Sequence, residues 1–104
     1  MEITSVELQE KINSGKKVIV EFWAEWCGPC KMMKPLFERV ASQNTSNVEM
    51  YTMNVDLNKE IGASLGIRSI PTIKVFQNSN IIDTRVGMMN EGQINGILTE
   101  LING

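Results

Sequence analysis

The chain contains no histidine among its 104 residues. Histidine is the commonest general base in enzymes, the usual partner of a nucleophilic cysteine and a frequent zinc ligand. Its absence excludes His-based acid–base catalysis, Cys–His nucleophile pairs and zinc sites that mix cysteine with histidine. Any chemistry that the chain performs must therefore use cysteine, carboxylates or backbone groups.

Long apolar runs and clusters of basic residues are also missing. No apolar stretch approaches the roughly 18 residues that a membrane span needs. The 10 basic and 12 acidic residues give a net charge of −2, and the basic ones are scattered from Lys11 to Arg85 instead of forming a stripe that tracks nucleic acid. The amino terminus lacks the features of a secretory signal. We therefore expect a cytoplasmic protein that binds neither membranes nor, by its charge, nucleic acid.

Length and composition indicate one domain. The chain is 42% apolar and 21% charged, which is near the average for globular proteins, and 104 residues are too few for the core to split. The sequence has no internal repeat, low-complexity tract or linker. Residues 1–104 are therefore interpreted as a single domain.

Hydrophobic periodicity predicts alternating helices and strands. The expected helices cover 6–12, 30–43, 58–65 and 90–102, and the expected strands cover 17–23, 48–55, 72–77 and 81–86. The first two strands flank a helix and should be parallel, whereas a polar turn at 78–80 joins the last two as a hairpin. These elements together form a mixed sheet with helices on both faces.

Local signals support several of these boundaries. The pairs Thr4 with Glu7 and Asn90 with Gln93 have the spacing of a capping box. Pro35 falls inside the second helix and predicts a kink. In the third helix, Asn58 is the expected cap and Gly66 the expected left-handed residue at the end. These signals predict the starts of the first, third and last helices and the end of the third.

The two cysteines carry the chemical signal. Cys27 and Cys30 are separated by Gly-Pro and follow the nearly continuous apolar strand at 17–23. This spacing places both thiols in the first turn of the next helix, where the helix dipole and unpaired backbone N–H groups favour a thiolate. A thiolate attacks disulfides, and a second thiol nearby resolves the mixed disulfide that forms. Inert buried cysteines and half of a metal site shared between two chains are the alternatives, since a tetrathiolate site needs four sulfurs.

Residues 22–31, Phe-Trp-Ala-Glu-Trp-Cys-Gly-Pro-Cys-Lys, resemble the active-site signature of the thioredoxin family. The resemblance extends through most of the chain, because further family motifs follow in order and at similar spacing: Pro35, Asn54-Val55-Asp56, Gly66-Ile67-Arg68, Ile70-Pro71-Thr72 and Val86-Gly87. It implies a thioredoxin-like α/β fold, with a mixed sheet of about five strands and about four helices on both faces.

The resemblance also implies an activity. The chain would be a thiol–disulfide oxidoreductase that reduces protein disulfides, with Cys27 as the exposed nucleophile and Cys30 as the buried resolving thiol. Its partners would be disulfide-containing proteins and a separate thioredoxin reductase that supplies the electrons. Neither a bound cofactor nor a metal is implied, and a monomer is expected.

A substrate-binding groove beside Cys27 is implied as well. Pro71 would be cis and face the sulfurs, although the frequency of cis bonds alone favours trans. Gly87 would leave room for a partner's backbone, and Met88 is either a flexible contact or, as methionine more often is, packing filler. The residues expected at the groove are Trp26, Gly28, Pro29, Ile70, Pro71, Gly87 and Met88.

Three positions depart from the usual family pattern. Glu21 stands where the family commonly has a buried Asp, Thr52 stands where a lysine is common, and the last hairpin has Asn78-Ser79 in place of Asn-Gly. Glu21 interrupts a buried strand, so we expect it to have a raised pKa and a catalytic role as acceptor of the Cys30 proton. Thr52 supplies no cation, which should raise that pKa further. The alternative is a glutamate that reaches solvent from the strand end.

Two other functions use the same features. A non-catalytic binding subunit would dock a partner through the same groove, with incidental thiols. An oxidant or isomerase is less favoured, because Gly-Pro between the cysteines lacks the histidine often found in those relatives.

Overall fold

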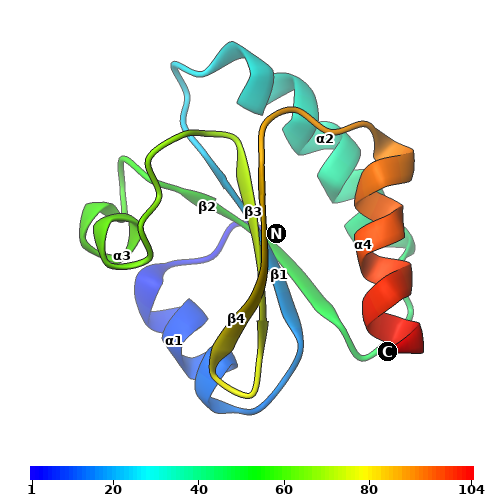
Figure 1. The fold of residues 1–104 in the computed structure, drawn as a ribbon. Coiled ribbons are helices and arrows are strands. Elements are labelled where there is room, and N and C mark those ends of the chain that lie inside the picture. The colour runs from blue at the N-terminus through cyan, green and yellow to red at the C-terminus, as the bar shows by residue number, and fades with distance from the viewer.

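The computed structural model describes all 104 residues and contains four helices and four strands (Figure 1). In chain order they are α1 (Ser5–Asn13), β1 (Val18–Trp23), α2 (Gly28–Gln43), β2 (Glu49–Asn54), α3 (Lys59–Ser64), β3 (Thr72–Gln77), β4 (Asn80–Val86) and α4 (Glu91–Asn103). Every predicted helix and strand is present, with ends that differ by one or two residues. None of the helices combines the length and the apolar character that crossing a membrane would require.

The four strands form one mixed sheet in the order β2-β1-β3-β4. β1 pairs with β2 in parallel and with β3 antiparallel, and β3 pairs with β4 antiparallel. The parallel pair and the hairpin are therefore confirmed, whereas the expected count of about five strands is wrong. At the free edge of β2 the chain makes only a single bridge, between Glu2 and Thr52. The segment cannot extend into a strand because α1 begins at Ser5.

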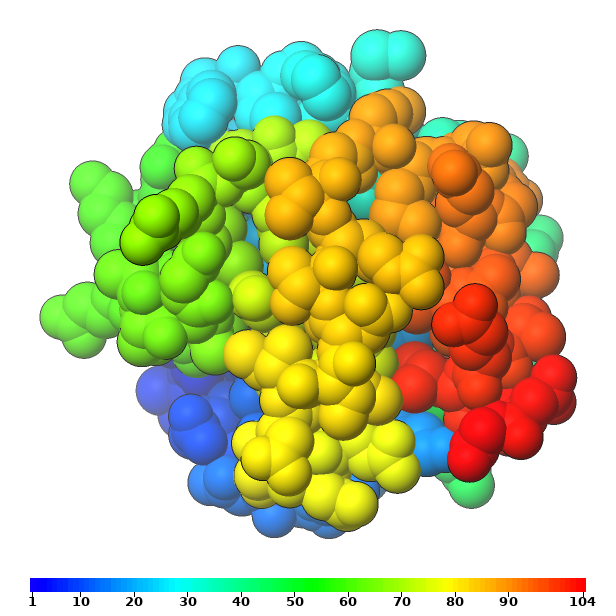
Figure 2. All heavy atoms as spheres, in the orientation of Figure 1, coloured from blue at the N-terminus to red at the C-terminus, as the bar shows by residue number.

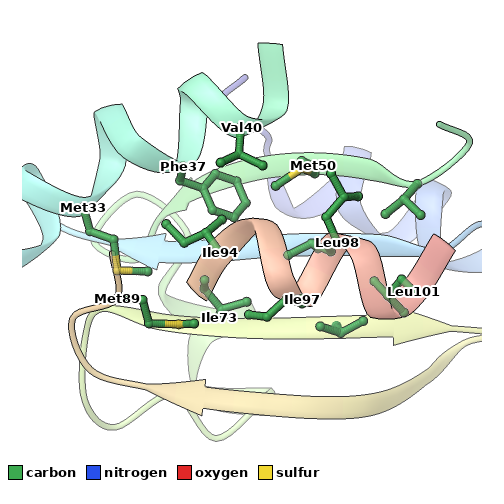
Figure 3. Close-up of a cluster of buried hydrophobic side chains, with 13 residues drawn as sticks. Met33, Phe37, Val40, Met50, Ile73, Met89, Ile94, Ile97, Leu98 and Leu101 are labelled. Carbon is green, nitrogen blue, oxygen red and sulfur yellow. The ribbon is translucent and has the colours of Figure 1, made fainter. Parts of the chain in front are cut away.

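Helices cover both faces of the sheet, which explains why all six residues of β1 are buried. Neighbouring residues of a strand point to opposite faces, so Ile19 packs in the core under α2 and α4, whereas Val20 packs in the core under α1. Figure 3 shows Phe37 of α2, Leu98 of α4 and Ile73 of β3 in the first of these cores. By the same alternation Glu21 and Trp23 point to the face that α2 covers.

The helix ends show how far the local signals hold. Both capping boxes form, at Thr4 with Glu7 and at Asn90 with Gln93. The cap expected at Asn58 does not form, because the Asn58 side chain accepts hydrogen bonds from the backbone and hydroxyl of Ser5 instead. Asn58 thus ties α1 to α3, a contact between segments far apart in the chain.

The turns follow the predicted chemistry. The hairpin turns at Asn78 and Ser79, with φ angles of 53° and 67°. Asparagine tolerates the left-handed conformation, which lets this hairpin close without glycine. Gly66 ends α3 with a φ of 71°, as expected for a left-handed glycine.

Candidate redox site at the start of α2

The two cysteines lie at the amino-terminal end of α2 and form a disulfide. Cys27 is the N-cap of this helix, and its Sγ accepts a hydrogen bond of 3.3 Å from the backbone N–H of Cys30. α2 begins at Gly28, two residues before the predicted start, and Pro29 occupies its first turn, where a missing N–H costs nothing. Both sulfurs therefore lie in the first turn, where helix dipole and backbone donors stabilise a negative charge.

The two sulfurs differ in their access to solvent. Cys27 exposes 5% of its surface and Cys30 none. The expectation of an exposed Cys27 is therefore wrong for the oxidised protein, although Cys27 is the more accessible of the pair. Its Sγ lies 3.8 Å from the carbonyl oxygen of Ile70, so the loop before β3 covers it.

Three loops meet at the disulfide. The Ile70–Pro71 peptide bond is cis, as the resemblance implied. The carbonyl oxygen of Pro71 accepts a hydrogen bond of 2.9 Å from the backbone N–H of Gly87, whose φ of 105° suits glycine. The space-filling view shows the cyan start of α2 near the orange segment that follows β4 (Figure 2). The residues around the disulfide thus come from three separate parts of the chain.

A hollow beside Trp26 contains two of the seven residues expected at the groove. Trp26 exposes 71% of its surface, and its indole Nε1 donates to the Oδ2 of Asp56 at 2.9 Å. Trp26 and Ile70 line a hollow of about 270 Å³. The other five expected residues do not line it: Gly28, Pro29, Pro71, Gly87 and Met88. Met88 is 46% exposed in the segment that follows β4. The other residues of the hollow are Val55, Lys59, Gly62, Ala63, Ile67 and Arg68.

Sequence reasoning missed two cations of this hollow. Lys59 and Arg68 line it, although neither belongs to the cysteine motif. Arg68 stands inside the Gly-Ile-Arg motif that contributed to the resemblance, which was the available signal. A larger hollow of about 950 Å³, between 15–17, 45–49 and the end of α4, lies at the opposite end of the molecule from the cysteines. Size alone therefore does not locate the chemistry in this protein.

Glu21 is fully buried, and neither of its carboxylate oxygens has a hydrogen-bond partner. Burial and, to a smaller extent, the nearby carboxylates of Glu38 and Glu2 raise the pKa of Glu21 to about 8, against the opposing effect of Lys34. The alternative in which Glu21 reaches solvent is thus wrong, and the expected raised pKa is confirmed.

A cation does approach this region, but from α2 and not from β2. Thr52 leaves its own position without a charge, whereas the Nζ of Lys34 lies 4.6 Å from the centre of the Trp23 ring. The same Nζ lies 3.5 Å from the Oε2 of Glu38, one helical turn further on. Sequence reasoning missed Lys34, although it is four residues after Cys30 and therefore on the same side of α2.

This arrangement supports one kind of chemistry. Two sulfurs form a disulfide at a helix start, beside a cis-proline loop, and a buried protonatable carboxyl lies on the sheet face under the same helix. No group of three or more His, Cys, Asp or Glu side chains is placed to hold a metal ion. The fold and the cysteine pair define a domain for thiol–disulfide exchange.

Comparison with known proteins gives the family. The thioredoxin family model matches residues 1–100. Thioredoxin of Rickettsia bellii is 42% identical over 86 residues, covering 83% of this chain and 82% of the relative. Thioredoxin of Porphyra purpurea is 38% identical over 95 residues, covering 91% and 89%. Plasmodium falciparum thioredoxin has a similar structure, with a TM-score of 0.86, 32% identity, and coverage of 95% of this chain and 96% of that one.

The chain belongs to the thioredoxin family. It is a thiol–disulfide oxidoreductase that reduces protein disulfides through Cys27 and Cys30, and its partners are disulfide-containing proteins and a thioredoxin reductase. These relatives favour the reductase over the non-catalytic binding subunit.

Proposed function

We propose that Cys27 attacks and Cys30 resolves. The Cys27 thiolate attacks one sulfur of a substrate disulfide, forming a mixed disulfide and releasing the first substrate thiolate. The Cys30 thiolate then attacks the Sγ of Cys27, forming the internal disulfide and releasing the second substrate thiolate. The substrate gains two electrons and two protons, and the reductase later returns the two electrons to the protein.

The position of Cys27 supports this order. Cys27 is the N-cap and the more accessible sulfur, so a substrate reaches it first. Cys30 is fully buried in the first turn of the helix, so a substrate does not reach its sulfur directly. The observation that carries the proposal is this disulfide at the start of α2.

Glu21 is the group that we propose to take the proton from the Cys30 thiol, directly or through one water. Glu21 and Trp23 share one face of β1, and Trp23 packs in one cluster with Cys30. A pKa of about 8 lies near neutrality, where a carboxylate accepts and returns a proton most effectively. Unlike a surface carboxylate, Glu21 has no hydrogen bond that would compete for the proton.

The substrate groove is proposed from the surroundings of Cys27. A partner's extended backbone pairs with the backbone of Ile70, in the manner of an added strand, and Gly87 keeps this approach open. The exposed residues Trp26 and Met88 flank it and supply apolar contact. Gly28 and Pro29, both exposed, form the rim at the helix start.

The protein is a cytoplasmic monomer in this proposal. A protein that reduces disulfides and must be recharged belongs in a reducing compartment, so we place it in the cytoplasm. Its own helices cover both hydrophobic cores of the sheet, which supports a monomer. The basic residues remain scattered, which argues against binding of nucleic acid.

The experiment follows reduction of insulin disulfides by the dithiol protein. The unaltered chain should reduce insulin, Cys27→Ser should be inactive, and Glu21→Gln should slow resolution of a preformed mixed disulfide at neutral pH. Equal activity of Cys27→Ser and the unaltered chain would refute the assignment of Cys27. Unchanged resolution in Glu21→Gln would remove the role of Glu21 alone.

A further inference from the structure

The Glu2 carboxylate is held at the edge of the sheet by three donors. Its Oε1 accepts from the indole Nε1 of Trp23 at 2.9 Å and from the Oγ1 of Thr52 at 2.7 Å. Its Oε2 accepts from the backbone N–H of Asn54 at 2.6 Å. A surface glutamate rarely makes three such bonds, so Glu2 has a fixed position.

The backbone on either side fixes the same position. The Thr52 N–H donates to the carbonyl oxygen of Met1 at 2.9 Å, and the Ile3 N–H donates to the carbonyl oxygen of Thr52 at 2.8 Å. The backbone of Thr52 therefore binds the residues on both sides of Glu2, and the hydroxyl of Thr52 binds the Glu2 carboxylate.

Thr52 is the neighbour of Glu21 across the parallel ladder. Paired residues point to the same face of a sheet, and neighbouring strands lie about 4.8 Å apart. Both residues are fully buried. A threonine hydroxyl has one proton to donate, and here Glu2 accepts it. This is why Glu21 has no donor even though a hydroxyl lies beside it.

We propose that Glu2 is a positioning residue for exchange, which holds the only proton of the Thr52 hydroxyl and so leaves the carboxyl of Glu21 without a hydrogen bond. Without Glu2, the hydroxyl is free to turn and donate to Glu21, and a donor stabilises the ionised carboxylate. The effect on exchange rests on the proposed role of Glu21 as proton acceptor.

The other charged groups around Glu21 come from α2. Lys34 favours the ionised form of Glu21, whereas Glu38 disfavours it, and Glu2 itself adds a negative charge on the side of β2. The charge of Glu2 and its hydrogen bond from the Thr52 hydroxyl thus both oppose ionisation of Glu21. Separating these two effects is the purpose of the test.

The test titrates Glu21 by ¹³C carboxyl NMR in the oxidised protein, in which neither cysteine titrates, with Glu21→Gln to assign the signal. Glu2→Gln removes the charge but keeps an oxygen that accepts from Thr52, whereas Glu2→Ala removes both. We expect the titration midpoint of Glu21 to be lower in Glu2→Gln than in the unaltered chain. In Glu2→Ala it should be lower than in Glu2→Gln by a further amount of about one to two pH units. With Thr52→Val in the background, the two Glu2 variants should titrate alike.

Equal midpoints for Glu2→Ala and Glu2→Gln would overturn the inference, as would a difference between them that persists with Thr52→Val. The pH profile of mixed-disulfide resolution separates this inference from the proposed function. If the Glu21 midpoint moves as expected and the rate profile moves with it, both hold. If the midpoint moves and the rate profile does not, Glu21 is not the proton acceptor and Glu2 has no part in exchange.

Discussion

Replacing Glu21 by leucine should stabilise the fold, and the gain should grow with pH. The folded pKa of about 8 lies above the ordinary value of 4.5. Below pH 4.5 both states are protonated, so ionisation costs no stability. Between pH 4.5 and 8 the unfolded chain ionises while the folded chain does not, which removes about 1.4 kcal/mol of stability per pH unit. Above pH 8 the loss is complete and constant.

The size of the gain follows from this interval. Relaxation of the buried site reduces the full value, so we expect the gain of Glu21→Leu to increase by about 2 to 4 kcal/mol from pH 5 to pH 9. A further part, about 1 to 3 kcal/mol, is independent of pH because leucine also removes a buried polar group that lacks a partner. These values are large beside the 5 to 15 kcal/mol that holds a typical domain together.

The assay is urea unfolding of the oxidised protein at pH 5, 6, 7, 8 and 9, which excludes cysteine ionisation from the result. Glu21→Gln is the matched control, since it removes the charge but keeps a buried polar side chain. Both variants should show the same increase with pH, with leucine more stable than glutamine throughout. A stability difference that stays constant from pH 5 to pH 9 would show that Glu21 is not a desolvated carboxyl.

Two further predictions concern charged residues outside the cysteine motif. Lys34→Met should raise the titration midpoint of Glu21 in the NMR measurement, because it removes the one cation that favours the carboxylate. Lys34→Arg keeps the cation and should leave the midpoint near that of the unaltered chain. A midpoint that does not rise in Lys34→Met would contradict this prediction. Glu49 loses hydration on burial, but hydrogen bonds from Lys16, Tyr51 and Lys11 outweigh this and lower its pKa to about 2. Its stabilising effect is present above pH 4.5 and is lost as the pH falls toward 2, so Glu49→Gln should cost about 1 to 2 kcal/mol at pH 7, allowing for solvent screening, and almost nothing at pH 2. A cost that does not change with pH in urea unfolding would refute it.

Strong local signals predicted the fold well. Both capping boxes, the apolar strand β1 and the left-handed Gly66 depend on neighbouring residues, and all three appear as expected. The fifth strand was the exception. Beside β2 the chain forms only the single bridge between Glu2 and Thr52, because the Thr4 capping box starts α1 at Ser5.

The site was predicted where a sequence motif contains it, at the cysteines and at the cis Ile70–Pro71 bond. Cys27, Cys30 and the buried Glu21 are visible in a single stretch around β1 and α2. Glu2 and Lys34 were missed because their roles arise from contacts across the fold: Glu2 reaches Thr52 over 50 residues, and Lys34 extends over the ring of Trp23. The predicted cap at Asn58 is absent for the same reason. The N–H and hydroxyl of Ser5 donate to the side-chain oxygen of Asn58 that would have capped α3.

The order of attack is tested most directly by trapping the mixed disulfide. Cys27→Ser and Cys30→Ser, each reduced, are mixed with a disulfide-bonded peptide, and the products are measured by intact mass. Cys30→Ser should accumulate a covalent adduct with one half of the peptide, because Cys27 attacks and no thiol resolves the product, whereas Cys27→Ser should form little or none. Adduct formation by Cys27→Ser and none by Cys30→Ser would contradict the assignment of Cys27 as the attacking thiol.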